Sequence, residues 1–438
     1  MRYQKEPHEE PFESYHVPDE IRDTVSGVIG DVREAGDQAV RQYTEKFDDV
    51  TRETNRLTEA ERNAAIDRVS DETKRIIDHS HGNIERFAEA QLEHVNDFEL
   101  EVEDGVIIGQ ETNPIERVGA YIPGGEYPLL SSALMGIVPA NVAGVDTIIA
   151  AMPPQDDGIP HPAAVYGADK AGVDEIYVIG GAQAIAAMGV GTDEVLSVDK
   201  IVGPGNIFVT EAKRQVYGEA GIDFLAGPSE ILVLADETGD AELIAADLLA
   251  QAEHDVAARP LLVTTSDALA SEVATEIESQ LETLSTAEIA REAWETKGTI
   301  IVADDVSEAV EISDTIAPEH LEVHTAEPRA QLEQLSNYGT VFLGPYSGNV
   351  FSDKLIGTNH VLPTQRAARY TAGLSVHMFL KHQTYQEVSE EGAAKLEPWA
   401  TKQSVLERLE GHAKSSFMRA PENELREYDS ATYELPDS

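Results

Sequence analysis

The chain has 438 residues and carries 32 Lys and Arg residues against 81 Asp and Glu residues, giving a net charge of −49. This excess of carboxylates argues against binding to nucleic acid or to anionic membranes, because no basic surface is available to replace their counterions. The chain has no cysteine, which excludes disulfides, thiolate metal sites and cysteine nucleophiles.

The acidic residues are spread along the whole chain, which points to a halophilic source. Carboxylates stay hydrated at high ionic strength, and salt screens their mutual repulsion. An ordinary acidic cytosolic protein is the alternative, although the excess of acids is large for that class. Residues 1–20 lack the apolar core of a signal peptide, and no stretch of about 18 apolar residues is present to span a membrane. We therefore expect a cytoplasmic protein.

In chain order, the polar residues 1–17 are expected to form an arm, and residues 18–95 show helical spacing of apolar positions. Short apolar runs then alternate with helical stretches such as HPAAVYGADKAG, NIFVTEAKRQVYGEAG, DAELIAADLLAQAEHD and DALASEVATEIESQLETL. The expected strands are RVGAYIPGG, VDTIIAAMPP, VDEIYVIGG, VDKIVGPG, EILVLAD, RPLLVTT, GTIIVADD, HLEVHT and GTVFLG. After about residue 384 the pattern is helical again.

This alternation indicates an α/β fold with mostly parallel sheets, and the strands are too numerous for one small sheet. We predict two incomplete Rossmann-like parallel-sheet domains with smaller helical segments at the N- and C-terminal ends. The predicted boundaries are an arm at 1–17, a first α/β domain at 18–120 plus 229–373, a second α/β domain at 121–228, and a C-terminal helical segment at 374–438.

Three glycine-rich turns follow expected strands, at IPGGEYP (122–128), VIGGAQAIAA (178–187) and IVGPGNIFVTEAK (201–213). The dinucleotide fingerprint GxGxxG is absent. The second and third turns lead directly into helices, whose N-terminal N–H groups can bind phosphate. Each turn alone is explained by the backbone freedom of glycine, whereas three together make a nucleotide or another anionic ligand plausible.

The chain has 13 histidines, and four of them have unusual neighbours: His254 in QAEHD, His320 in APEHL, His360 in SDKLIGTNHVLPT and His412 in RLEGHAK. Gln251 and His254 are spaced to share one helix face. Asp353 could add a carboxylate, and such nitrogen and oxygen ligands suit Zn²⁺, Mn²⁺ or Co²⁺. The QxxH spacing is weak, however, and an ordinary polar helix face explains it equally well.

The APEHL stretch, residues 317–321, places Glu319 and His320 side by side. Pro318 should end the preceding helix and favour an extended conformation at Ala317. Glu319 and His320 would then lie on a loop or at the entry to a strand, offering two proton acceptors with different pKa values. The alternative is a surface loop with two polar residues.

Long motifs found in order from about residue 115 to residue 412 resemble the histidinol dehydrogenase family. They are ERVGAYIPGG, VIGGAQAIAA, VDKIVGPGNIFVTEAKRQV, AGPSEILVLAD, LLAQAEHD, APEHL and SDKLIGTNHVLPT. The resemblance implies oxidation of L-histidinol to L-histidine with NAD⁺, through L-histidinaldehyde, by a homodimer with one zinc ion per active site.

The resemblance also assigns roles to single residues. The implied zinc ligands are Gln251, His254 and Asp353, with His412 supplied by the C-terminal segment of the partner subunit. The implied substrate contacts are Ser229, His320, His360 and Glu407 together with the four zinc ligands. The implied NAD contacts are Tyr121, Gln183 and Asn206, and the implied catalytic pair is Glu319 and His320.

The absence of cysteine agrees with this chemistry, because the aldehyde cannot be trapped on a thiolate and water must add to it directly. Our hypothesis is that His320 takes the alcohol proton, Glu319 activates water, and zinc orients the substrate. The segment GPYSGNVFS, residues 344–352, departs from the family pattern. Alternatives are a paralogue acting on another amino alcohol or polyol, a zinc hydrolase using Glu319, and a non-catalytic protein with this fold.

Overall fold

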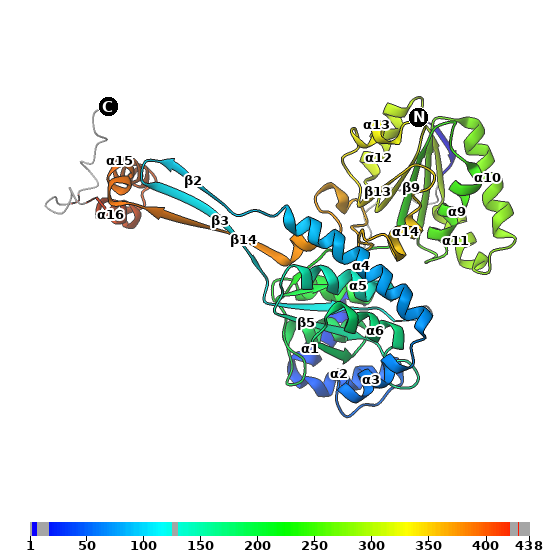
Figure 1. Ribbon diagram of the computed structural model, residues 1–438, viewed down its shortest axis with the longest axis horizontal. Helices are drawn as coiled ribbons and strands as arrows, with labels where there is room; N and C mark the ends of the chain where they lie inside the picture. The colour runs from blue at the N-terminus through cyan, green and yellow to red at the C-terminus, as the bar shows by residue number, and fades with distance from the viewer. Residues whose placement is uncertain (1, 7–16, 125–129, 421–427, 429–438) are drawn as a thin grey trace. The chain divides into compact units, whose positions relative to one another are not determined.

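The computed structural model describes residues 2–6, 17–124, 130–420 and 428 of the chain. The chain divides into two compact units (Figure 1). Unit 1 comprises residues 1–92 and 115–379, and unit 2 comprises residues 93–114 and 380–438. No helix among the described residues is long and apolar enough to cross a membrane.

Unit 1 contains a five-stranded parallel sheet with the order β6-β5-β4-β7-β8. Its strands are β4 (Arg117–Tyr121), β5 (Thr147–Met152), β6 (Glu175–Val178), β7 (Lys200–Val202) and β8 (Gly221–Ile222). The helices that accompany it are α1 (Asp19–Ala35), α2 (Asp37–Asp48), α3 (Glu59–Asp67), α5 (Leu130–Val142), α6 (Pro162–Ala171), α7 (Gly181–Val190) and α8 (Ile207–Val216). Apolar side chains of α1, α2, α7 and α8 form one buried core with this sheet.

Unit 1 also contains a six-stranded sheet with the order β1-β11-β10-β9-β12-β13, in which β1 is antiparallel to β11 and the other pairs are parallel. Its strands are β1 (Arg2–Lys5), β9 (Glu230–Ala235), β10 (Arg259–Thr264), β11 (Thr299–Val302), β12 (His320–His324) and β13 (Thr340–Leu343). Its central strand β9, with the sequence EILVLA, is buried along its whole length, as expected for a parallel strand covered on both faces.

Two separate cores lie on the two faces of this six-stranded sheet. One core contains side chains of α9 (Ala241–Ala252), α10 (Asp267–Leu281) and α11 (Ala287–Lys297), and the other contains side chains of α12 (Val306–Ile316). The remaining helices of unit 1 are α4 (Asp71–Glu93), α13 (Pro328–Leu332), α14 (Asn349–Lys354) and the 3₁₀ turns Ala367–Arg369 and Val376–Phe379.

Unit 2 is an antiparallel sheet of three strands with two helices. The strands are β2 (Phe98–Glu103), β3 (Val106–Pro114) and β14 (Leu380–Val388), in the order β14-β3-β2, and the helices are α15 (Glu390–Leu406) and α16 (Glu410–Phe417). The edge strand β2 has the sequence FELEVE, and every one of its residues is exposed.

The α/β class with two largely parallel sheets is confirmed, and each of the nine predicted apolar runs contains a strand. The grouping of the parts differs from the predicted boundaries. Residues 2–5 of the expected arm form strand β1, and residues 7–16 lie outside the described residues. The helices α1, α2 and α3, expected in the domain of the six-stranded sheet, instead contact α6, α7 and α8 beside the other sheet. The reason is that the apolar side chains of α1 are buried against α7 and α8. Which helices pack together depends on the fit of their apolar surfaces, and not on their order in the sequence.

Candidate active site

The catalytic pair predicted from APEHL lies where α12 ends and β12 begins. His320 is the first residue of β12, as the strand-entry interpretation expected. The expectation of an extended Ala317 is wrong, because Ala317 has φ 53° and ψ 61° and caps α12 in the left-handed conformation. Its N–H donates to the carbonyl of Ser313 at 2.8 Å, and this capping bond outweighs the preference for extended backbone before Pro318.

Glu319 is a buried carboxyl held by one backbone donor. Its Oε2 accepts a hydrogen bond from the N–H of Glu230, the first residue of β9, at 2.8 Å. Burial raises the pKa of Glu319 well above its ordinary value, and the charges of Glu230 and Asp353 raise it further. Glu319 is therefore a stronger base, once ionised, than an exposed carboxylate.

His320 is also buried, and its two ring nitrogens have different surroundings. Nδ1 lies 3.0 Å from the carbonyl oxygen of Glu230, which can only accept, so Nδ1 carries the proton of the neutral ring. Nε2 has no hydrogen-bond partner among the described residues and lies 3.8 Å from Oδ1 of Asp353. Burial lowers the pKa of His320, so the ring is neutral at pH 7 and its Nε2 lone pair can accept a proton.

Two of the four implied metal ligands, Asp353 and His254, lie near this ring, and a third, Gln251, is joined through Asn349 to the helix that carries Asp353. Asp353 lies on α14, and His254 is close enough for its charge to act on His320. Gln251 is buried on α9, and its Oε1 accepts from Nδ2 of Asn349 at 3.0 Å. His254 lies beyond Ala252, the last residue of α9, and its N–H bonds the carbonyl of Gln251 at 3.3 Å. The prediction that both share one helix face is therefore wrong for His254.

These donors fit a divalent cation bound by nitrogen and oxygen. Gln251 keeps a second lone pair on Oε1 beside the bond from Asn349, and that bond fixes which end of the amide is oxygen. Imidazole and carboxylate complete a set typical of Zn²⁺ or Mn²⁺.

Two further predicted residues border this group. His360 lies with Nδ1 3.1 Å from the carbonyl oxygen of Asp353 and with Nε2 3.2 Å from Oγ of Ser132. Burial lowers the pKa of His360 as well. Ser229 immediately precedes β9, and its carbonyl accepts from the N–H of Arg259 at 2.9 Å. The structure thus brings these residues to the same end of β9 and β12.

The two implied residues of the C-terminal segment belong to unit 2. Glu407 is the C-cap of α15 and accepts from Nε2 of Gln403 at 2.8 Å. His412 lies on α16 and borders a groove of about 1030 Å³ between α15, α16 and β14. Both side chains are exposed.

The three implied NAD contacts line one cavity of about 940 Å³ beside the five-stranded sheet. Tyr121 ends β4, and its hydroxyl accepts from the N–H of Gly181, where α7 begins, at 3.1 Å. Gln183 is buried in the first turn of α7, and Asn206 is the N-cap of α8. The predicted helix starts after the second and third glycine turns are thus observed, whereas residues 125–129 of the first turn lie outside the described residues.

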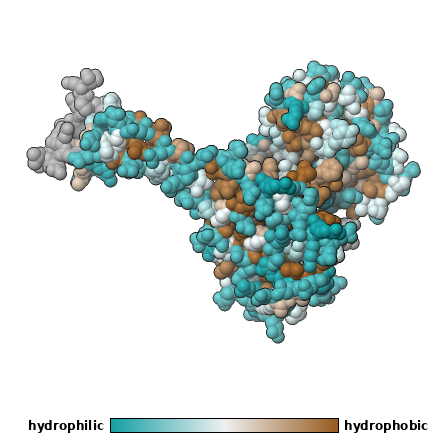
Figure 2. Space-filling view, viewed as in Figure 1, coloured by the Kyte–Doolittle hydropathy of each residue, from teal (hydrophilic) through white to brown (hydrophobic). Residues whose placement is uncertain are grey.

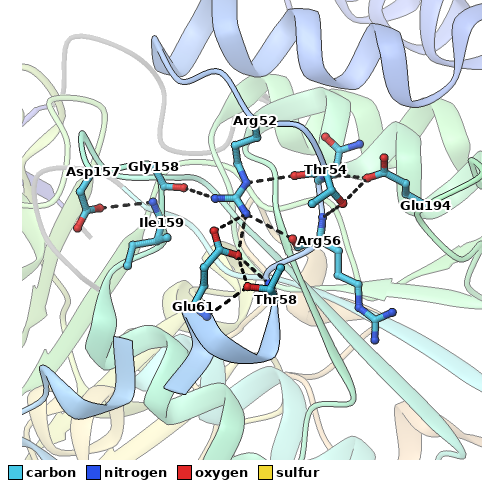
Figure 3. Close-up of polar contacts among 10 residues, drawn as sticks. Arg52, Thr54, Arg56, Thr58, Glu61, Asp157, Gly158, Ile159 and Glu194 are labelled. Atoms are coloured by element: carbon cyan, nitrogen blue, oxygen red, sulfur yellow. Dashed lines mark hydrogen bonds and ion pairs between the residues drawn. The ribbon is translucent and has the colours of Figure 1, made fainter. Parts of the chain in front are cut away.

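A network centred on Arg52 braces the wall of this cavity (Figure 3). Arg52 forms hydrogen bonds from Nη2 to both carboxylate oxygens of Glu61 at 3.0 Å and from Nη1 to the carbonyl of Gly158 at 2.7 Å. Glu61 also completes the capping box of α3 with Thr58. The loop from Pro153 to His161, which supplies several cavity residues, is therefore tied to α3.

Sequence reasoning missed the buried polar residues Glu230, Glu322, His324 and Asn349 and the half-buried Asp247, all beneath the site. A usable signal was present in the strand HLEVH, because alternate residues of a strand point to the same face. His320, Glu322 and His324 therefore share one face of β12. Asn349 belongs to the segment 344–352 that departs from the family pattern, and it contacts both Gln251 and Glu322.

Comparison with known proteins shows similarity over nearly the whole chain. The profile of the family described as histidinol dehydrogenase matches residues 13–420. A "Histidinol dehydrogenase homolog" of Shouchella clausii is 45% identical over 91% of this chain and 94% of its own length. A "Histidinol dehydrogenase" of Clostridium acetobutylicum is 44% identical over 91% of this chain and 92% of its own length. The crystal structure of histidinol dehydrogenase from Elizabethkingia anophelis has a TM-score of 0.89 and 36% identity, covering 93% of this chain and 94% of that one.

Proposed function

Because the chain belongs to the histidinol dehydrogenase family, we propose that it is an oxidoreductase of histidine biosynthesis that converts L-histidinol to L-histidine through L-histidinaldehyde. The observation that carries this conclusion is 44% identity to relatives named for the activity, over nine-tenths of the chain. Each histidinol gives up two hydrides to two molecules of NAD⁺ and gains one oxygen atom from water, and the released protons pass to solvent.

We assign the proton transfers of the alcohol step to His320. Its Nδ1–H is held by the carbonyl of Glu230, which leaves the lone pair of Nε2 directed away from that bond. The lowered pKa keeps the ring neutral at pH 7, so it can accept the hydroxyl proton as a hydride leaves the adjacent carbon. His320 takes a second proton from the hydrated aldehyde before the second hydride leaves.

We assign activation of water to Glu319. A carboxylate with a raised pKa removes a proton from water more readily than an exposed carboxylate does. Water then adds to the aldehyde carbon, and the resulting gem-diol is oxidised to the acid. The backbone N–H of Glu230 fixes Glu319 in position.

The proposed ligands of a zinc ion are Gln251, His254 and Asp353, with His412 contributed from a second copy of the chain. When bound, zinc would supply a template for the imidazole and amine of the substrate. Ser229, His360 and Glu407 are proposed to contact the substrate itself. In support, Asp353 lies 3.8 Å from the unbonded Nε2 of His320, and its carbonyl contacts His360. Gln251 bonds Asn349, which lies on the same helix as Asp353.

The proposed NAD⁺ contacts are Tyr121, Gln183 and Asn206. In support, all three line the same cavity, at the start of α7 and α8. The N-terminal N–H groups of such helices attract phosphate oxygens. The bound dinucleotide supplies the hydride acceptor.

A homodimer is proposed because unit 2 exposes apolar side chains on an unpaired sheet edge. Phe98, Leu100 and Val102 alternate with glutamates along β2, and their exposed fractions are 55, 53 and 47%. An exposed edge strand with apolar side chains tends to pair with another chain, so we expect a second chain to cover it. A second copy of the chain would also explain why Glu407 and His412 are exposed in one copy.

The cytoplasmic location and the halophilic source remain predictions from composition.

The test is the number of NADH molecules formed per L-histidinol consumed, measured in molar KCl before and after treatment with a chelator. Two NADH per substrate, lost on chelation and restored by Zn²⁺ or Mn²⁺, are expected. One NADH per substrate would indicate a paralogue that stops at the aldehyde. This alternative is relevant because the Shouchella relative is named only as a homolog of histidinol dehydrogenase. No NADH at any salt concentration would reject the proposed function.

A further inference from the structure

A second group of potential metal donors lies beneath the candidate active site. It consists of Asp247 on α9 together with Glu322 and His324 on β12. One donor atom from each residue lies within 4.8 Å of the other two. The group shares no residue with the proposed zinc ligands Gln251, His254 and Asp353, and the site residues assigned above leave it without a function.

Asp247 is half-buried, whereas Glu322 and His324 are buried and have unsatisfied donor atoms. Glu322 is 0% exposed and His324 is 3% exposed. Neither ring nitrogen of His324 has a hydrogen-bond partner among the described residues, and the same holds for Oε2 of Glu322. Nε2 of His324 lies 3.3 Å from that Oε2, a spacing that two ligands of one cation adopt. A buried imidazole with both nitrogens unbonded is costly unless something else binds it.

The orientation of Glu322 is fixed from the other side. Its Oε1 accepts from the N–H of Asn349 at 2.8 Å, and this bond directs Oε2 toward His324. Asp247 approaches the same carboxylate closely enough to hydrogen-bond with it. The two carboxyl groups therefore face each other beside His324, where a cation could bind both.

We propose that Asp247, Glu322 and His324 bind a divalent transition-metal ion, such as Mn²⁺ or Zn²⁺, at a site separate from the one proposed for catalysis. Two carboxylates and one imidazole are hard and borderline donors that suit these ions, and the cation neutralises both buried charges. The ion would link α9, which carries Gln251, to β12, which carries His320. This proposal does not depend on the proposed function.

The experiment counts metal ions per chain. The full-length protein is stripped with a chelator, dialysed in molar KCl against Zn²⁺ with excess Mg²⁺ to displace surface ions, and analysed by mass spectrometry of the metal. The wild type is expected to bind two Zn²⁺ per chain. Glu322→Gln should lose one ion, His254→Ala should lose the other, and the exposed control Glu333→Gln should keep both.

The outcomes separate the two sites. An ion that Glu322→Gln loses and His254→Ala retains supports the proposal even if the catalytic site binds none. An ion count in Glu322→Gln equal to that of the wild type would overturn it. His324→Gln, which retains both carboxylates, gives the same test if Glu322→Gln does not fold, and its count decides in the same way.

Discussion

His320 and Glu319 are neighbours in the chain, and one cause shifts their pKa values in opposite directions. Burial favours the neutral form of each group, so it lowers the pKa of the imidazole and raises that of the carboxyl. The adjacency was visible in the sequence, but the burial was not. The backbone of Glu230 supplies both the donor to Glu319 and the acceptor for His320, and no sequence spacing connects residue 230 with residues 319 and 320.

The two residues should therefore be separable by mutation and by pH. Glu319→Gln should oxidise L-histidinol to the aldehyde but slow oxidation of added L-histidinaldehyde by about 10²- to 10⁴-fold, the usual contribution of a general base. His320→Gln should slow both steps. Because Glu319 acts only after losing its proton, the aldehyde step of the wild type should accelerate as pH rises through the raised pKa, and Glu319→Gln should lose this dependence. NADH formation from each substrate across pH is the measurement, and wild-type rates on the aldehyde in both variants would contradict the assignment.

At the scale of elements, the apolar runs of the two parallel sheets were predictable because buried parallel strands are continuously apolar. The three strands of unit 2 were not predicted, since their residues are mostly polar and exposed. FELEVE and LKHQTYQEV contain no continuous apolar run, and LKHQTYQEV pairs with β3, about 270 residues earlier in the chain. The end of α9 was also misjudged: the apolar spacing continues through His254, but the helix itself stops at Ala252.

The glycine turn after β7 gives an element-scale prediction. Gly203 has φ +115°, and a Cβ there would lie 2.1 Å from the carbonyl oxygen of Tyr121. Gly203→Ala should therefore destabilise the protein by at least about 2 kcal/mol, through backbone strain and steric clash. It should also raise the KM for NAD⁺, because Tyr121 lines the cavity proposed for the dinucleotide.

The matched control is Gly27→Ala in the middle of α1, where an added Cβ meets no atom within 4 Å. That change should stabilise the protein by about 0.5–1 kcal/mol, since alanine favours helix. Thermal unfolding and NAD⁺ kinetics of the two variants are the measurements. Equal behaviour of both variants would show that the Gly203 turn tolerates a side chain.

At the scale of the whole molecule, the net charge of −49 dominates the surface. Hydrophilic residues cover much of the face drawn in Figure 2, with apolar residues between them. With so many like charges, the folded state is destabilised by their repulsion unless salt screens it. The distance over which charges interact falls from about 30 Å at 0.01 M salt to about 3 Å at 1 M.

The unfolding midpoint should therefore rise steeply between dilute and molar KCl. For a protein of this size, each kcal/mol of added folding stability raises the unfolding midpoint by up to about 2–4 °C. Salt screens many repelling carboxylate pairs at once, so the summed rise should be readily measurable. Calorimetry across KCl concentrations is the measurement, with sucrose as the control for stabilisers that do not screen charge. A midpoint that is the same in dilute and molar KCl would contradict the halophilic interpretation.

The division into units also fixes an order of events during synthesis. Strand β3 pairs with β14 from Leu380↔Pro114 to Val388↔Val106, so the chain between these strands is the larger part of unit 1. This part begins at Ile115 and ends at Phe379, and the N–H of Ile115 donates to the carbonyl of Phe379 at 2.9 Å. On the ribosome, β3 therefore emerges long before its partner strand exists, and unit 2 can assemble only after unit 1 has brought residues 115 and 379 together.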